Sequence, residues 1–194
     1  MRVHLVRHGE CDGTGAVLHG RAAGVALNRA GRRQAVRTAR RLADEPLAAI
    51  YTSPVERAQE TAGIIAALHD LTPITHDGFI EIDYGDWTGR DLRELDGDEH
   101  WRAYNVSRST TAPPRGEHPL AVQSRAVEAL EVLRRMHADE RIVVVSHADV
   151  IRAVVASVLG FSLENSLRLE IAPASVTMLQ LNEGWPQVLS LGTR

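Results

Sequence analysis

Two short apolar runs, each followed at once by residues that can do chemistry, constrain the fold of this 194-residue chain most strongly. Val3–Val6 has one polar interruption, His4, and Ile142–Val145 has none, so both read as buried strands. Apolar residues at helical spacing separate these strands from other apolar runs. Strands that alternate with helices predict an α/β fold, a three-layer α/β/α sandwich around a mostly parallel central sheet.

The remaining elements are expected at positions marked by caps and turn residues. Residues 8–26 are rich in glycine and lack periodicity, so they should form a loop. Asn28 is a suitable N-cap for a helix of about 16 residues. Pro54 lies near the first position of a second helix, where its missing N–H costs nothing. We further expect a strand over 47–51, helices over 120–137 and 150–159, and a closing hairpin of strands 176–181 and 187–191.

The length suits a single domain over residues 1–194. Residues from about 77 to 119 differ from the rest because turn-forming glycines and prolines interrupt them, with a short helical patch around Leu92–Tyr104. We interpret this stretch as a lid-like insertion that influences substrate choice, since such loops commonly carry function.

Composition excludes several classes of partner. The net charge of −3 gives no basic field, so nucleic acid is not favoured as a partner. No apolar run is long enough to span a bilayer and no signal segment is recognisable, so we expect a cytoplasmic protein without a membrane partner. That two copies of the chain form a homodimer is a hypothesis only. All 22 basic residues are arginines, so a cationic anion site here must use guanidinium groups.

Several chemically capable residues are expected at one edge of the sheet. Arg7-His8-Gly9 follows the first strand directly, and His147 follows the strand that ends at Val145. Arg57 lies on the first turn of the helix after the second strand. Ligands of open α/β sheets bind beyond the carboxyl ends of the strands, so these side chains should meet there.

Such a set suits phosphoryl transfer, in which negative charge must be held by fixed positive groups. Arg7 and Arg57 can supply forked guanidinium contacts. A neutral His8 can attack through one ring nitrogen while a hydrogen bond to the other fixes the tautomer, and Gly9 would leave room for that approach.

Two further residues complete the chemistry. His147, protonated beside bound phosphate, would be a further cationic clamp. Glu81 is the candidate acid and base, which protonates the leaving oxygen and then activates water. Asp83 and Asp86 lie near it in the sequence and are alternatives for this role.

Four motifs in this order resemble those of the histidine phosphatase superfamily, the phosphoglycerate mutase-like proteins. They are Arg7-His8-Gly9 after the first strand, residues 27–35, Ser53-Pro54 with Arg57-Ala58, and Val145-Ser146-His147. The resemblance implies a small phosphorylated substrate, no metal and no cofactor. It implies that Arg7, His8, Arg57 and His147 form the catalytic core, with phosphate carried on His8 and Glu81 as proton donor. It also suggests substrate or phosphate contacts for His19 and Gly20.

Within that family, four positions favour a phosphatase over a mutase. Thr14 stands where the mutases usually have Asn, Cys11 where they have Ser or Thr, and Ala148-Asp149 where they commonly have Gly-Asn. We therefore expect a phosphomonoester hydrolase with a phosphohistidine intermediate, and keep a mutase and a non-catalytic phospho-ligand sensor as alternatives. A metal-dependent hydrolase is disfavoured because no histidines form a ligand pair. The lid arginines, read as solvated or as contacts for a second anionic group, are Arg90, Arg102, Arg108 and Arg115.

Overall fold

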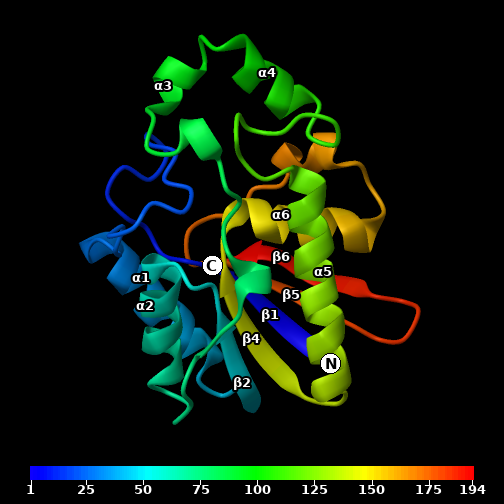
Figure 1. Ribbon diagram of the computed structural model, residues 1–194. Helices are drawn as coiled ribbons and strands as arrows, with labels where there is room; N and C mark the ends of the chain where they lie inside the picture. The colour runs from blue at the N-terminus through cyan, green and yellow to red at the C-terminus, as the bar shows by residue number, and fades with distance from the viewer.

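The computed structural model describes residues 1–194 and has a six-stranded sheet at its centre (Figure 1). The strand order is β3-β2-β4-β1-β5-β6. Strands β3, β2, β4 and β1 are parallel, whereas β5 runs antiparallel to β1 and β6 antiparallel to β5. The mostly parallel sheet and the closing hairpin are thereby confirmed. The strands are β1 (Arg2–Arg7), β2 (Leu47–Thr52), β3 (Ile74–Thr75), β4 (Arg141–Ser146), β5 (Val176–Gln180) and β6 (Gln187–Thr193).

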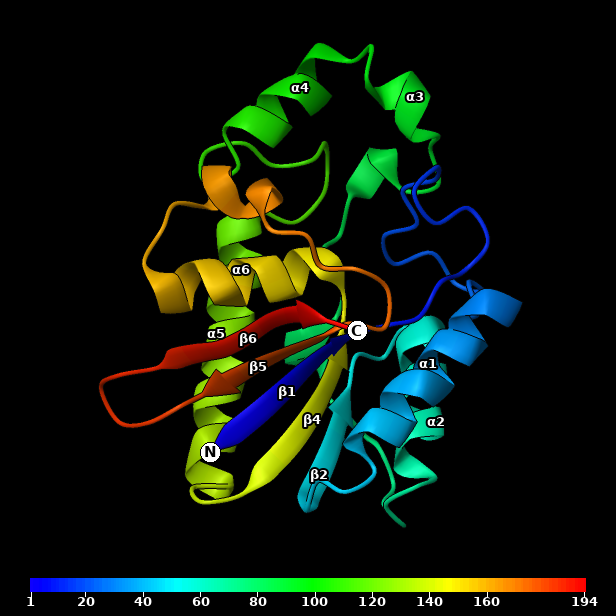
Figure 2. The same ribbon diagram turned by 180° about the vertical axis from the view of Figure 1, so that it is seen from behind.

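Helices cover both faces of this sheet (Figures 1 and 2). Helices α1 (Arg29–Leu42) and α2 (Glu56–Ala66) pack on one face, and α5 (Pro119–Met136) and α6 (Ala148–Leu159) pack on the other. The short helices α3 (Leu92–Leu95) and α4 (Glu99–Val106) lie beyond the end of the sheet. None of these helices combines the length and the apolar character that crossing a bilayer requires.

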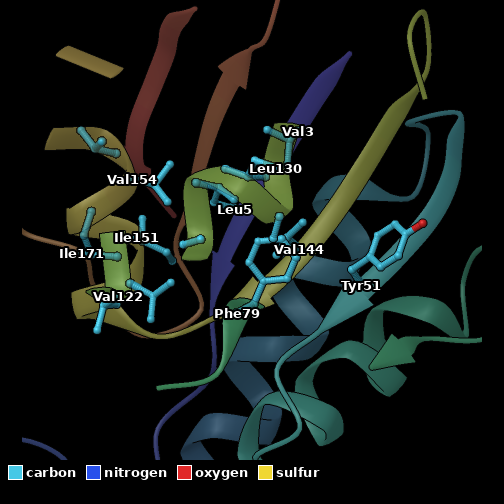
Figure 3. Close-up of a cluster of buried hydrophobic side chains, with 14 of the residues drawn as sticks. Val3, Leu5, Tyr51, Phe79, Val122, Leu130, Val144, Ile151, Val154 and Ile171 are labelled. Carbon is cyan, nitrogen blue, oxygen red and sulfur yellow. The ribbon is translucent and has the colours of Figure 1, made fainter. Parts of the chain in front are cut away.

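Strand β4 shows why the central strands are apolar along their whole length. Ile142 and Val144 belong to the cluster on the α5 and α6 side, where Figure 3 shows Val144 near Leu130. Val143 and Val145 belong to the cluster under α1 and α2. A strand buried on both faces has no solvent side, so the alternation of polar and apolar residues disappears.

The structure corrects some of the expected boundaries. Helix α2 begins at Glu56 with Val55 as its N-cap, so the prediction that Pro54 lies near the first helical position was wrong by two residues. The helical patch around Leu92–Tyr104 is two separate helices, α3 and α4. The N-cap of α1 is Asn28, as predicted, and its side chain accepts a hydrogen bond from Gly31 N at 2.8 Å.

Residues 85–118 lie over the carboxyl ends of the parallel strands, at the top of Figure 1, whereas residues 77–79 pack in the main core beside α5 and β4. The whole stretch contacts the rest of the molecule through apolar side chains of the main core, such as Phe79 and Ile82, and through polar groups. The Tyr84 hydroxyl donates a hydrogen bond to the carboxylate of Asp149, and Arg108 pairs with the same carboxylate at 3.2 Å. Ser109 N donates to Glu164 Oε1 at 3.0 Å. The stretch therefore lies against α6, the helix that follows His147.

Candidate active site

The two histidines singled out in the sequence meet at the carboxyl edge of the sheet. His8 follows β1 and His147 follows the neighbouring strand β4, where it is the N-cap of α6. Their ring centroids lie 5.1 Å apart with the ring planes inclined at 60°. Both side chains are buried. Parallel pairing of β1 with β4 is what brings them together.

The hydrogen bonds of His8 define which nitrogen is free to react. Its Nδ1 lies 2.7 Å from the Gly9 carbonyl oxygen, which can only accept, so Nδ1 carries the proton. The lone pair is then on Nε2, which accepts a hydrogen bond from Arg57 Nε at 3.1 Å. Burial, with the positive charges of Arg57 and Arg7, holds the pKa of His8 well below its usual value. The ring is therefore neutral, with Nε2 as its nucleophilic atom.

The two arginines next to His8 retain hydrogen-bonding capacity. Arg57 Nη2 donates to the carbonyl of Gly20 at 2.7 Å, and Arg7 Nη1 donates to the carbonyl of Ile171 at 2.7 Å. Arg57 Nη1 and Arg7 Nε are buried without a partner in the protein. Buried donors normally have partners, and both side chains line the same cavity. The pair is therefore equipped to bind an oxyanion.

His147 is held between a hydroxyl group and a carboxylate. Its Nε2 lies 2.7 Å from Ser53 Oγ. Its Nδ1 lies 3.4 Å from Arg57 Nη2, which can only donate, and 3.5 Å from Glu81 Oε2. Burial and the nearby His8 and Arg57 lower its pKa well below the usual value. Without a ligand the ring is thus neutral, and the expected cationic form requires a bound anion to raise the pKa again.

Glu81 is the carboxylic acid that reaches this site. Its Oε1 accepts a hydrogen bond from Ile82 N at 3.0 Å, and its Oε2 lies 4.0 Å from Arg57 Nη2. Burial, and secondarily the charge of Asp149, raise its pKa to about 7 although Arg57 opposes this. The alternatives do not reach the cavity: Asp83 accepts from Gly85 N, and Asp86 pairs with Arg115.

The first loop supplies His19 and Gly20 to the cavity wall. The His19 ring Nε2 hydrogen-bonds to the Asp12 carbonyl at 2.8 Å. Gly20 adopts a φ of +51°, and its carbonyl orients the Arg57 guanidinium. Gly20 therefore acts through its backbone.

Gly9 has a different purpose from the one expected. A Cβ at this position would lie 2.6 Å from the carbonyl oxygen of Gly31, in the first turn of α1. The absent side chain lets α1 pack against the loop. The idea that Gly9 clears the approach to His8 was wrong.

A cavity of about 380 Å³ extends from Arg7, His8, Arg57 and Glu81 to the lid. His147 is fully buried and is not among the residues that line it. Of the other lining residues, Arg108 was singled out from the sequence only as one of four lid arginines and Asp149 only as a departure from the mutase pattern. Arg108, Tyr84, Asp149 and Arg152 all line the cavity. Among the lid arginines only Arg108 does so, and its exposed fraction is 5%, whereas Arg115 is 82% exposed and Arg90 and Arg102 contact acidic or carbonyl groups of the lid itself. The position of Asp149, two residues after His147 on the first turn of the same helix, was a signal that it could line the site.

No group of three or more histidine, cysteine, aspartate or glutamate side chains is arranged to hold a metal ion.

Comparison with known proteins agrees with this geometry. A sequence profile of the histidine phosphatase superfamily (branch 1) matches residues 3–194. Phosphoserine phosphatase 1 of Hydrogenobacter thermophilus is 31% identical over 196 residues, covering 98% of this chain and 92% of that protein. The 2,3-bisphosphoglycerate-dependent phosphoglycerate mutase of Thermoplasma acidophilum is 30% identical over 189 residues, covering 97% and 90%. The solved structure of a mycobacterial glucosyl-3-phosphoglycerate phosphatase superposes with a TM-score of 0.90 at 25% identity, covering 100% and 99% of the two chains. The profile match over nearly the whole chain means that this protein belongs to the histidine phosphatase superfamily.

Proposed function

We propose that this protein is a metal-independent phosphomonoesterase that hydrolyses a small phosphorylated metabolite through a phosphohistidine formed on His8. The observation that carries the proposal is the buried, neutral His8 ring, whose unprotonated Nε2 faces Arg57. A carboxylic acid with a pKa of about 7, Glu81, lies on the same cavity. A nucleophile and a proton donor side by side are what ester cleavage requires. Two relatives that carry phosphatase names support the same reading.

In the first half of the proposed reaction, Arg7, Arg57 and His147 bind the phosphoryl oxygens. His8 Nε2 forms a bond to phosphorus as the bond from phosphorus to the ester oxygen breaks. The leaving oxygen takes the proton of Glu81, so the alcohol departs neutral. The guanidinium groups hold the charge that spreads over the equatorial oxygens.

In the second half, the same groups work in reverse order. The Glu81 carboxylate takes a proton from a water molecule, whose oxygen bonds to phosphorus as the bond to His8 Nε2 breaks. Inorganic phosphate leaves, His8 returns to its neutral form, and Glu81 is protonated again for the next cycle. A raised pKa suits this double use, because both forms of the carboxyl group are accessible near neutral pH.

The proposed intermediate can be tested directly. We expect hydrolysis of p-nitrophenyl phosphate to persist in EDTA, and an alkali-quenched reaction with labelled substrate to carry the label on His8. The His8→Ala variant should lose at least about a thousandfold in kcat/KM, since it removes the nucleophile. His69→Ala, on a residue outside the cavity, is the matched control and should keep full activity. Undiminished turnover by His8→Ala would remove His8 as the nucleophile.

A mutase is the second candidate, because one relative is a phosphoglycerate mutase. Cys11, Thr14 and Asp149, the positions that depart from the mutase pattern, all line the cavity. We therefore expect 3-phosphoglycerate with 2,3-bisphosphoglycerate to give little 2-phosphoglycerate. Rapid interconversion of the two monophosphates would instead favour the mutase.

Two further parts of the proposal concern organisation. Residues 77–119 would act as a lid on a single domain, supported by the place of residues 85–118 over the strand ends and by the Arg108–Asp149 contact. The homodimer and the cytoplasmic location stay predictions. Sedimentation equilibrium of the purified chain decides the first, since a mass near 21.3 kDa would mean a monomer.

A further inference from the structure

At the end of the cavity beside the first turn of α6, a carboxylate of the protein lies between two arginines. Asp149 Oδ1 lies 3.2 Å from Arg108 Nη1 and 3.0 Å from Arg152 Nη1. Its other oxygen accepts a hydrogen bond from the Tyr84 hydroxyl. All four residues line the cavity. Asp149 thus occupies the place that an anionic group of a ligand would need in order to reach both arginines.

Other contacts fix the arginines in this arrangement. Arg108 Nη2 donates to Asn105 Oδ1 at 3.3 Å, and its guanidinium lies 4.8 Å from the centre of the Tyr104 ring. Arg152 Nε donates to the Leu169 carbonyl at 2.9 Å. The side chain of Asp149 is only 10% exposed, so water screens its charge weakly. Asp149, Arg108 and Arg152 thus form an ion-pair network whose geometry is fixed by protein groups alone.

The charges at this end of the cavity cancel. Arg108 and Arg152 bring two positive charges, and Asp149 with Glu170 brings two negative ones. The adjoining wall is apolar, formed by Leu18 from the first loop and Leu92 and Trp101 from the lid. A neutral end with an apolar wall favours contact with an uncharged group.

We propose that Asp149 makes the leaving-group end of the cavity accept phosphomonoesters of uncharged, partly apolar alcohols and reject those that carry a second anionic group. This inference rests on the proposed phosphatase function. A substrate carboxylate would be repelled by Asp149, and it could reach the arginines only by leaving the Asp149 carboxylate buried without a partner. Selectivity then comes from a repulsive element within the site.

A matched pair of substrates isolates the charge. Glycerol 3-phosphate and 3-phosphoglycerate differ only in a hydroxymethyl group against a carboxylate, and phenyl phosphate reports on the apolar wall. We expect kcat/KM to be higher for glycerol 3-phosphate than for 3-phosphoglycerate by about tenfold or more, the range that one hydrogen-bonded charge contributes. Phenyl phosphate should be hydrolysed at least as well as glycerol 3-phosphate.

Asp149→Asn tests the residue itself. Loss of the charge frees both guanidinium groups, so the ratio of kcat/KM for 3-phosphoglycerate to that for glycerol 3-phosphate should rise about tenfold. The substitution also changes the pKa of Glu81, but both substrates are compared at the same pH, so this change affects both rates alike and cancels in the ratio. Asp86→Asn is the control, because Asp86 also pairs with a lid arginine but lies outside the cavity. Its ratio should equal that of the wild type.

The outcomes separate the inference from the function on which it rests. A wild-type enzyme that prefers 3-phosphoglycerate overturns the inference, whether or not Asp149→Asn folds. An unchanged ratio in a variant that still hydrolyses glycerol 3-phosphate overturns it as well. If the wild type hydrolyses none of the three esters and forms no phosphohistidine, the proposed function fails and the inference with it.

Discussion

Glu81 is a carboxyl group whose pKa the fold raises to about 7. Its environment combines burial, which disfavours the charged form, with the negative Asp149 across the cavity. Arg57, 4.0 Å away, acts in the opposite direction but does not outweigh burial. An acid that must release a proton to a leaving oxygen works best when its pKa lies close to the operating pH.

The pH dependence of kcat/KM should therefore report on Glu81. The protonated form donates, so activity should be retained below a pKa of about 7 and fall about tenfold per pH unit above it. Glu81→Gln should lose activity most for substrates with poor leaving groups and least for p-nitrophenyl phosphate, whose leaving group needs little protonation. A profile that still rises at about pH 9 would contradict this assignment of the acid.

Residue-level reasoning from the sequence located the groups around the histidines but not Arg108. Arg7 ends β1, His8 and His147 directly follow strands, and Arg57 lies in the first turn of α2, so chain direction alone places them at one edge. Arg108 is different, because it lies in a loop after α4 and not at the end of a strand or the start of a helix. Nothing local distinguishes Arg108 from three other lid arginines, and only tertiary packing buries it.

Among the elements, the contact of α1 with the loop after β1 depends on the absence of two side chains. A Cβ on Gly31 would lie 2.0 Å from the Glu10 carbonyl oxygen, and one on Gly9 would lie 2.6 Å from the Gly31 carbonyl oxygen. Both obstacles are backbone atoms, which cannot rotate away. The helix that covers one face of the sheet is thereby positioned directly against the segment that carries His8.

Gly31→Ala should accordingly destabilise the protein. We expect a loss of about 1–3 kcal/mol in the free energy of unfolding, the usual cost of overpacking, measured by urea denaturation. Gly63→Ala on α2 is the control, because a Cβ there meets nothing within 4 Å. That variant should gain up to about 1 kcal/mol from helix propensity. Equal stability of the two variants would mean that the loop can move aside.

Elements were predictable where burial imposes a pattern and not where backbone pairing alone creates them. The unbroken apolar run of β4 predicts a strand, because both faces of that strand are covered. Strand β3 was not foreseen, since it has two exposed residues and pairs only with the end of β2. The start of α2 was misplaced because Val55, an uncommon N-cap residue, makes no side-chain cap.

For the molecule as a whole, Asp149 connects the lid to α6, one of the two helices that cover a face of the sheet. It lies on α6 and binds Tyr84 and Arg108, both from residues 77–119. The two nearby arginines and the Tyr84 hydrogen bond hold its pKa far below the usual value although burial opposes this. A carboxyl group with a depressed pKa in the folded state stabilises the fold above its unfolded pKa of about 3.9, and the contribution is lost as the pH falls further.

Acid unfolding should reveal this connection. At neutral pH, Asp149→Asn should lower the free energy of unfolding by about 3 kcal/mol or more, because it leaves Arg108 buried without its counter-charge. Below about pH 4 the Asp149 carboxylate of the unfolded chain takes up a proton while the folded wild type keeps it charged, so the wild type loses this advantage and the difference in Tm between wild type and variant should shrink as the pH is lowered. Asp86→Asn, at an exposed lid pair, should show nearly no difference at any pH. A Tm difference that stays constant from neutral to acidic pH would mean that the charge of Asp149 does not hold the lid, because hydrogen bonding alone would then account for the loss in both ranges.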